Sequence, residues 1–271
     1  MALEGVGTDI IAVVTVLIGI VAFFYSNLGL GGGQLYVPIM DFFLPDTYSM
    51  KDIVPLSLMF AFVTMITATY THTKKKLVNF KLGIPLALAG LIGVAAGVTF
   101  TSTVEETIVK AGFALLLIIV ATKMLYDIYR AKAENKISPE AFSRKQWLAG
   151  IGVSVLTGFF IGSFGIGGGV VSVPLIIYAF RVEARKAIGT SALMGAILTP
   201  AAFLAYVLTT TGDGSEIPYG LGLILTPIVF VMAFVGSTWG LKKLRTPIVK
   251  TIFTCGVYIA ASEMIYSLLY T

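Results

Sequence analysis

Residues 29–38 read GLGGGQLYVP, and residues 165–174 read GIGGGVVSVP, 136 positions further along the chain. Glycine costs about 1 kcal/mol in the interior of a helix, yet each stretch holds three glycines in a row, followed five residues later by a proline. Proline is tolerated in the first turn of a helix, because the amides there have no intrahelical partner. Each stretch therefore predicts a helix that ends, a break, and a new short helix, at about 34–45 and 169–180.

The composition around these stretches is that of a membrane protein. The chain has 271 residues, of which 57% are hydrophobic and 12% are charged, whereas a soluble domain has about 25% charged residues. Eight apolar stretches approach the roughly 20 residues that a helix needs to cross a bilayer: 10–28, 53–70, 82–100, 107–126, 147–162, 187–209, 219–240 and 247–269. We predict an all-α polytopic membrane protein. No Lys or Arg precedes the first stretch, so we expect it to remain as a helix rather than act as a cleaved signal peptide.

Few residues in the chain are suited to catalysis. There is one cysteine, Cys255, and one histidine, His72. A single cysteine excludes an internal disulfide and a cysteine-based metal cluster, and a membrane-embedded enzyme would need a cluster of His, Cys, Asp or Glu at membrane depth. We predict that the protein is not an enzyme and has no catalytic residue, metal or cofactor.

The basic residues predict the topology. Most of the 19 Lys and Arg residues fall in four short stretches, 74–81, 130–145, 181–186 and 242–250. Basic loops stay in the cytoplasm, so these four stretches share the inner side and require no nucleic-acid partner. Threading the chain accordingly predicts a multi-pass protein of the cell inner membrane with both termini extracytoplasmic.

The two halves of the chain also resemble each other. TIVKAGF at 107–113 matches PIVKTIF at 247–253, in addition to the glycine motifs. We predict a first repeat over 1–128, a cytoplasmic linker over 129–146 and a second repeat over 147–271. Each repeat would be a broken hairpin plus three transmembrane helices, entering the membrane from opposite faces. Inverted repeats of this kind are typical of secondary transporters, whose substrate lies near the midplane at the repeat interface. An old duplication in a channel or structural protein is the alternative.

Two breaks that meet would form an anion site, because a helix amino terminus carries roughly half a positive charge and unpaired amides. Alternatively, the glycines only allow close helix crossing, and the small hydroxyls only bond their own backbone. The candidate substrate-binding residues are the break glycines and the polar residues beside them: Asn27, Gly31, Gly32, Gly33, Gln34, Ser57, Ser163, Gly167, Gly168, Gly169, Thr190 and Ser191.

Two charged residues within predicted spans are candidates for coupling or gating. Lys123 and Glu263 occupy equivalent places in the two halves. Ionisable groups within spans are often functional, so Glu263 could carry a proton and Lys123 could gate an anion. Both also lie close enough to helix ends to reach the membrane surface.

The paired GxGGGxxxVP motifs, together with ARKAIGTSALM at 184–194, NFKLGIPLALAGLIGVAAG at 79–97 and ATKMLYD at 121–127, resemble the TauE/SafE family of membrane transporters over nearly the whole chain. The resemblance implies a secondary carrier that exports small sulfur oxyanions or organosulfonates, such as sulfite or sulfoacetate. It implies an ion gradient (H⁺ or Na⁺) as the driving force, no nucleotide domain, contact with membrane lipid and a possible homo-oligomer. An anion channel on the same scaffold and a cation carrier are the rival functions.

Matched by position, the family's glycine motifs fall on the two quoted stretches, and its GTS motif falls on Gly189, Thr190 and Ser191. The first half departs from the pattern there, with Pro55, Leu56 and Ser57 in place of the triplet.

Overall fold

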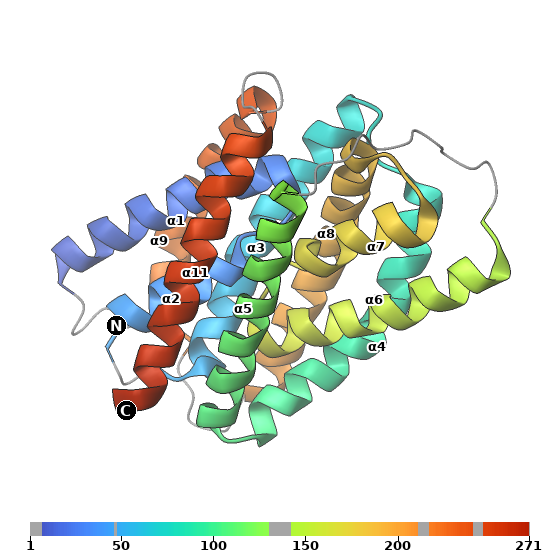
Figure 1. Ribbon diagram of the computed structural model, residues 1–271. Helices are drawn as coiled ribbons and strands as arrows, with labels where there is room; N and C mark the ends of the chain where they lie inside the picture. Colours follow the sequence, from blue (N-terminus) through green and yellow to red (C-terminus); the bar gives the residue numbers. More distant parts are fainter. Residues whose placement is uncertain (1–6, 46–47, 130–141, 211–216, 241–245, 271) are drawn as a thin grey trace.

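The computed structural model describes residues 7–45, 48–129, 142–210, 217–240 and 246–270, and within these ranges the chain is helical with short connections and no strand (Figure 1). In chain order the helices are α1 (Thr8–Leu28), α2 (Gly33–Phe43), α3 (Met50–Lys74), α4 (Phe80–Thr103), α5 (Glu106–Tyr129), α6 (Arg144–Phe164), α7 (Gly169–Phe180), α8 (Ala184–Thr210), α9 (Tyr219–Val235), the π-helix η1 (Gly236–Gly240) and α11 (Thr246–Tyr270).

The bundle is built to span a membrane. Six helices of the described chain are long and apolar enough to cross a bilayer: α1, α3, α4, α6, α8, and α9 continued through η1. The helices α5 and α11 have 24 and 25 residues, which is also the length of a span. The all-α polytopic fold is therefore confirmed.

The two breaks fall where the glycine motifs predict them. Helix α1 ends at Leu28, and Gly29 adopts a left-handed conformation with φ of 61°. Helix α6 ends at Phe164 in the same way, with φ of 66° at Gly165. Only glycine adopts such angles without strain, so the motif glycines end both helices.

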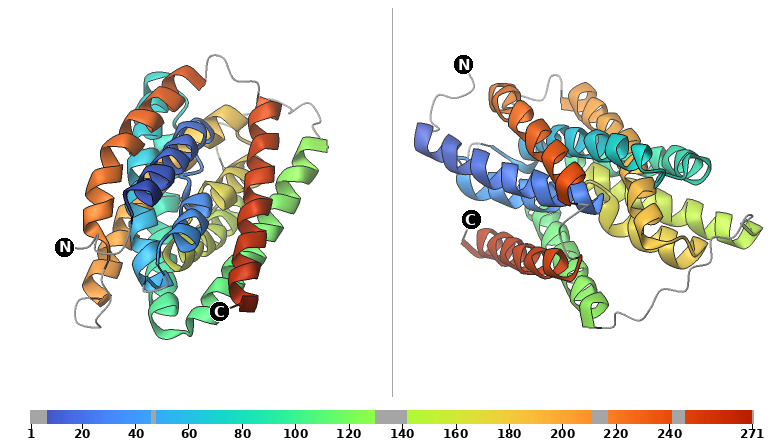
Figure 2. Two further views of the ribbon diagram at one scale, coloured as in Figure 1. Left: turned by 90° about the vertical axis from the view of Figure 1, so that its left-hand side faces the viewer. Right: turned by 90° about the horizontal axis from the view of Figure 1, so that it is seen from above.

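Equivalent helices of the two halves have equivalent neighbours, and each pair of neighbours comes from the opposite half. In order along each half, α1 corresponds to α6, α2 to α7, α3 to α8, α4 to α9 and α5 to α11. Helix α4 packs against α6 and α8, and its counterpart α9 packs against α1 and α3. The remaining large contacts join counterparts directly, α3 with α8 and α5 with α11. Figure 2 shows α5 and α11 together at one side of the bundle, with α9 at the opposite side.

Counterpart helices run in opposite directions where they touch. Near one end of the α3–α8 contact His72 faces Gly189, and further along Met65 faces Gly195, so the residue numbers rise in opposite senses. An inverted repeat requires this arrangement, whereas the orientation in a membrane stays a prediction. The repeat boundaries also stay a prediction, and residues 130–141 of the predicted linker lie outside the described residues.

Candidate functional site

The two glycine breaks cross in direct backbone contact inside the bundle. A Cβ atom added to Gly31 would lie 2.5 Å from the Cα of Gly167. On either side of this point, Gly33 abuts the carbonyl of Gly165, and Gly169 abuts the carbonyl of Gly29. The breaks therefore converge, but in this conformation their backbones leave no room for an anion directly between Gly31 and Gly167.

Two serines brace the crossing reciprocally. Ser57 of α3 donates a hydrogen bond to the carbonyl of Gly165 at 3.0 Å, and Ser191 of α8 donates to the carbonyl of Gly29 at 3.2 Å. Ser57 and Ser191 are counterparts, as are Gly29 and Gly165. Each half thus supplies the hydroxyl that satisfies the terminal carbonyl of the other half's break.

The helices that begin at the breaks have no side-chain caps. Gly32 and Gly168 are the N-cap residues of α2 and α7, and at neither helix start does an N-cap side chain accept a hydrogen bond from the first backbone amides. By comparison, Ser143 and Gln146 form a capping box at the start of α6. The first amides of α2 and α7 can therefore donate to a ligand, and both helix dipoles favour a negative charge.

Gln34, in the first turn of α2, has an unused hydrogen-bonding group. Its side chain is fully buried, its amide nitrogen donates to the Tyr25 hydroxyl at 3.0 Å, and its Oε1 has no partner. Rotating the amide by half a turn would let the oxygen accept from Tyr25 and would free two N–H donors. The counterpart of Gln34 in α7 is Val170, which has no polar group to offer. The unpaired carboxamide oxygen is therefore present at the first break and not at the second.

The other predicted polar residues are buried and mostly occupied. Ser163 donates to the carbonyl of Gly97, and Thr190 donates to that of Lys186. Because a hydroxyl has one proton to donate, Ser57, Ser163 and Ser191 hold the scaffold together in this conformation. Asn27, at 8% exposure, lies in the last turn of α1.

Two polar residues that the sequence analysis does not single out, Ser172 and Tyr36, also form hydrogen bonds around the crossing. Ser172 and Ser191 share a hydrogen bond of 2.7 Å, and the Tyr36 hydroxyl shares one of 3.0 Å with Thr64. Ser172 and Tyr36 occupy the same place in the two quoted motifs, two residues before the proline. This shared position was the signal that would have pointed to them.

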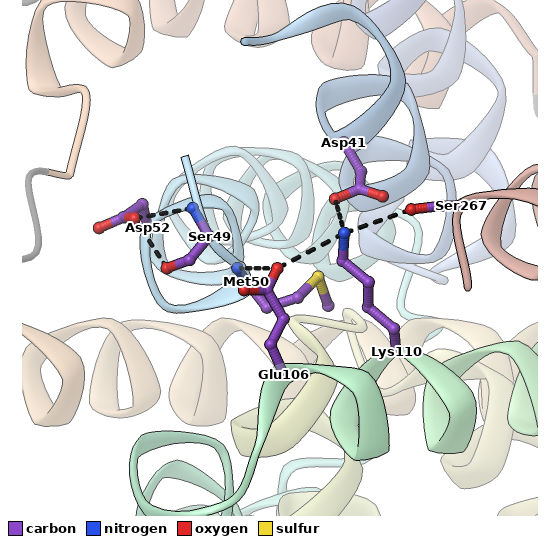
Figure 3. A network of polar contacts seen from close by, with 7 residues as sticks. All are labelled: Asp41, Ser49, Met50, Asp52, Glu106, Lys110 and Ser267. Atoms are coloured by element: carbon purple, nitrogen blue, oxygen red, sulfur yellow. Dashed lines mark hydrogen bonds and ion pairs between the residues drawn. The ribbon is translucent and has the colours of Figure 1, made fainter. Parts of the chain in front are cut away.

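A charged network ties the far end of α2 to α5 and α11 (Figure 3). The ammonium of Lys110 lies 3.0 Å from the Asp41 carboxylate, 3.4 Å from Glu106 and 3.3 Å from the Ser267 hydroxyl. Glu106 also accepts from the backbone amide of Met50 at 3.2 Å. Asp41 is buried, so its ion pair with Lys110 holds α2 against α5.

The two predicted coupling residues lie in different surroundings. The Oε2 atom of Glu263 is buried without a hydrogen-bond partner, and the charges of Asp41 and Lys110 act on this carboxylate. The ammonium of Lys123 lies over the ring of Tyr178 of α7, 5.5 Å from its centre. Glu263 thus lies close to the α2 network, whereas Lys123 contacts the short helix of the other half.

Broken helices that cross inside a polytopic bundle are typical of secondary transporters, and the comparisons with known proteins agree. The family model of the sulfite exporter TauE/SafE matches residues 13–264. The chain belongs to this family and is a multi-pass membrane transporter.

Relatives with similar sequences are also named as transporters. A probable membrane transporter protein of Methanocaldococcus jannaschii is 30% identical over 83% of this chain and 80% of its own length. The probable membrane transporter protein YunE of Bacillus subtilis is 24% identical over 94% of this chain and 97% of its own. One from Haemophilus influenzae is 27% identical over 79% and 80%. No solved structure matches.

Proposed function

We propose that the protein is a secondary transporter that exports a small sulfur oxyanion or organosulfonate, such as sulfite or sulfoacetate, across the cell membrane by alternating access. The family is named for sulfite export. The proposal includes a coupling ion, H⁺ or Na⁺, both termini on the extracytoplasmic side, and a possible homo-oligomer.

The observation that carries the proposal is the pair of uncapped helix starts at the buried crossing, with the Gln34 carboxamide, whose oxygen has no partner and whose rotation would free two N–H donors, beside one of them. Backbone amides and a carboxamide suit the spread charge of a sulfonate or sulfite group, because each oxygen can accept a separate N–H. The described residues at the crossing carry no charge of their own, so the helix dipoles and amides provide the attraction.

We place the anion beside the crossing, at the start of α2, rather than between the two triplets. Gly31 and Gly167 touch, and Tyr36 lies over Gly32, where an added Cβ would be 2.5 Å from the tyrosine Cζ. In this conformation the site is closed. Opening it requires α2 and Tyr36 to shift relative to the second break, which is the movement that alternating access supplies.

The test is counterflow in proteoliposomes. Vesicles that contain the purified protein and are preloaded with unlabelled sulfite or sulfoacetate should accumulate external ³⁵S-labelled anion transiently, and protein-free vesicles should not. Absence of counterflow for both anions would contradict the proposal. Single-channel currents without counterflow would indicate an anion channel instead.

A further inference from the structure

His72 is a buried titratable group that takes no part in the anion site proposed above. Its side chain is 0% exposed, and neither ring nitrogen has a hydrogen-bond partner. It lies in the last turn of α3, and the next residue, Thr73, is exposed. An unpartnered buried donor costs about 1–3 kcal/mol, so this ring is held in an unfavourable state one residue away from the exposed end of its helix.

His72 lies beside the helix that carries the brace and near the helix that ends at the first break. A Cβ atom on Gly189 of α8 would be 3.2 Å from the Cβ of His72, and Gly189 lies two residues before the bracing Ser191. The backbone carbonyl of Ser26, in the last turn of α1, is also near the ring but does not complete a hydrogen bond. Neither Gly189 nor Ser26 has a titratable side chain. The charged group that acts on His72 is Lys75, at the end of its own helix.

The residue at the equivalent position of the second half forms the hydrogen bond that His72 lacks. The counterpart of His72 is Tyr206 of α8, at the same 134-residue offset that relates Ser57 to Ser191. Tyr206 donates a hydrogen bond of 2.7 Å to the carbonyl of Gly162, the counterpart of Ser26. Both halves thus place a side chain over the last turn of the broken helix, where carbonyls have no intrahelical partner. In the second half that side chain is a permanent donor.

We infer that His72 is the coupling-proton site of the transporter, so that the coupling ion is H⁺ and the proton leaves the cell together with the anion, down the outward gradient of the anion itself. Protonation makes both ring nitrogens donors, which lets the ring bond the carbonyl of Ser26 and fix the end of α1. The positive ring is disfavoured by burial and by Lys75. An anion at the first break offsets this cost, so the anion and the proton each favour the binding of the other. This inference rests on the proposed function.

Because His72 is the single histidine, its protonation can be observed directly. Protein labelled with ¹³C-histidine would be titrated by NMR from pH 3 to pH 8, with and without 2-hydroxyethanesulfonate, a C2 sulfonate with no titrating group in this range. We expect the midpoint of the ring's titration to rise by about one pH unit with the sulfonate, which corresponds to tenfold coupling. A ring that does not titrate, or a midpoint that the sulfonate leaves unchanged, would overturn the inference.

Transport gives the second test. Because a carrier is reversible, an imposed proton gradient should drive it in the direction opposite to export: in proteoliposomes with an acidic exterior, wild-type protein should accumulate the sulfonate and acidify the lumen. In His72→Gln and in His72→Tyr, which installs the group of the second half, this driven accumulation should fall at least tenfold, while counterflow persists at saturating sulfonate with an affinity up to about tenfold weaker. Wild-type accumulation in His72→Gln would overturn the coupling role. Wild-type vesicles without counterflow would instead contradict the proposed function. Should both variants misfold, the titration of the wild-type ring decides.

Discussion

The short helices α2 and α7, which follow the two breaks, are held at their far ends by different chemistry. Asp41 of α2 is ion-paired with Lys110, whereas Phe180 of α7 packs edge-on against Phe142 and Trp147, with ring centres 5.0 and 5.8 Å apart. An ion pair can be exchanged for water or another charge, but an aromatic cluster has to expose apolar surface to open. On this ground we expect the first break to move more than the second.

The long helices of the two breaks differ in the same sense. Helix α6 meets α4 backbone to backbone, with Gly158 against the carbonyl of Gly90 and Gly93 against that of Val155. The counterpart contact of α1 places Gly19 against the side chain of Met232 in α9, with 3.4 Å from an added Cβ to Cγ, and is backbone to backbone only at its far end, where Gly236 of η1 abuts the carbonyl of Phe23. Flexible side chains accommodate sliding, whereas interlocked backbones do not. We therefore expect the α4–α6 contact to serve as the framework and the proposed site at the first break to move.

The largest effect should come from the rigid contact between α4 and α6. Gly158→Ala places a methyl group on the carbonyl of Gly90 and should cost about 3 kcal/mol in the free energy of unfolding. The matched variant Gly19→Ala, at the looser contact, should cost less than about 0.5 kcal/mol. Thermal unfolding of both proteins in detergent measures the difference. Equal losses would show that the two contacts are equally rigid.

The next largest effect should come from the ion pair between Asp41 of α2 and Lys110. Lys110→Met leaves the buried carboxylate of Asp41 without its cation and should destabilise the protein by about 3 kcal/mol or somewhat less. The double variant Asp41→Asn/Lys110→Met should recover most of this loss, because it removes the stranded charge as well. Unfolding of the two single variants and the double variant completes the cycle. Additive losses would mean that the two residues are not coupled.

The polar difference between the breaks is tested at Gln34. Gln34→Leu removes the spare amide at the start of α2 and should weaken anion binding roughly 10- to 100-fold, since a hydrogen bond to a charge contributes about 1.5–3 kcal/mol. The counterpart change Val170→Leu should alter affinity less than twofold. Sulfite affinity measured by calorimetry and by the concentration dependence of counterflow decides. If both variants bind alike, the site is not at the first break.

The smallest effect should come from the reciprocal serines. Ser57→Ala should cost about 1 kcal/mol by removing one hydrogen bond. Ser191→Ala should cost slightly more, because it also removes the bond to Ser172. Thermal unfolding of the two variants tests this order. A larger loss in Ser57→Ala would mean that the second break, which Ser57 braces, depends more on its brace than the first break does.

The sequence predicts the breaks well, because glycine and proline act locally. The predicted short helices at 34–45 and 169–180 correspond to Gly33–Phe43 and Gly169–Phe180. Repeat offsets also identify Ser57 and Ser191 as a pair. They do not reveal that each serine bonds the other half's break, because that exchange depends on how the halves pack.

The same limit applies to the charged and titratable residues. Lys110 and Asp41 are far apart in the chain and have no shared motif, so their ion pair depends on packing alone. His72 looks in sequence like part of a basic turn, and only the fold buries it beside α1. The prediction of an anion held between the triplets likewise could not foresee that their backbones touch.

The two serine hydrogen bonds between the halves also constrain the order of folding during biosynthesis. The carbonyl of Gly29 is satisfied by a serine that follows it by 162 residues. At about 5–20 residues per second, the ribosome needs roughly 10 to 30 s to deliver that serine. During this interval the first hairpin is in the membrane with its terminal carbonyl unmet, dependent on water or on the insertion machinery. The amino-terminal half of this transporter therefore cannot mature before about the first third of its carboxy-terminal half has been made.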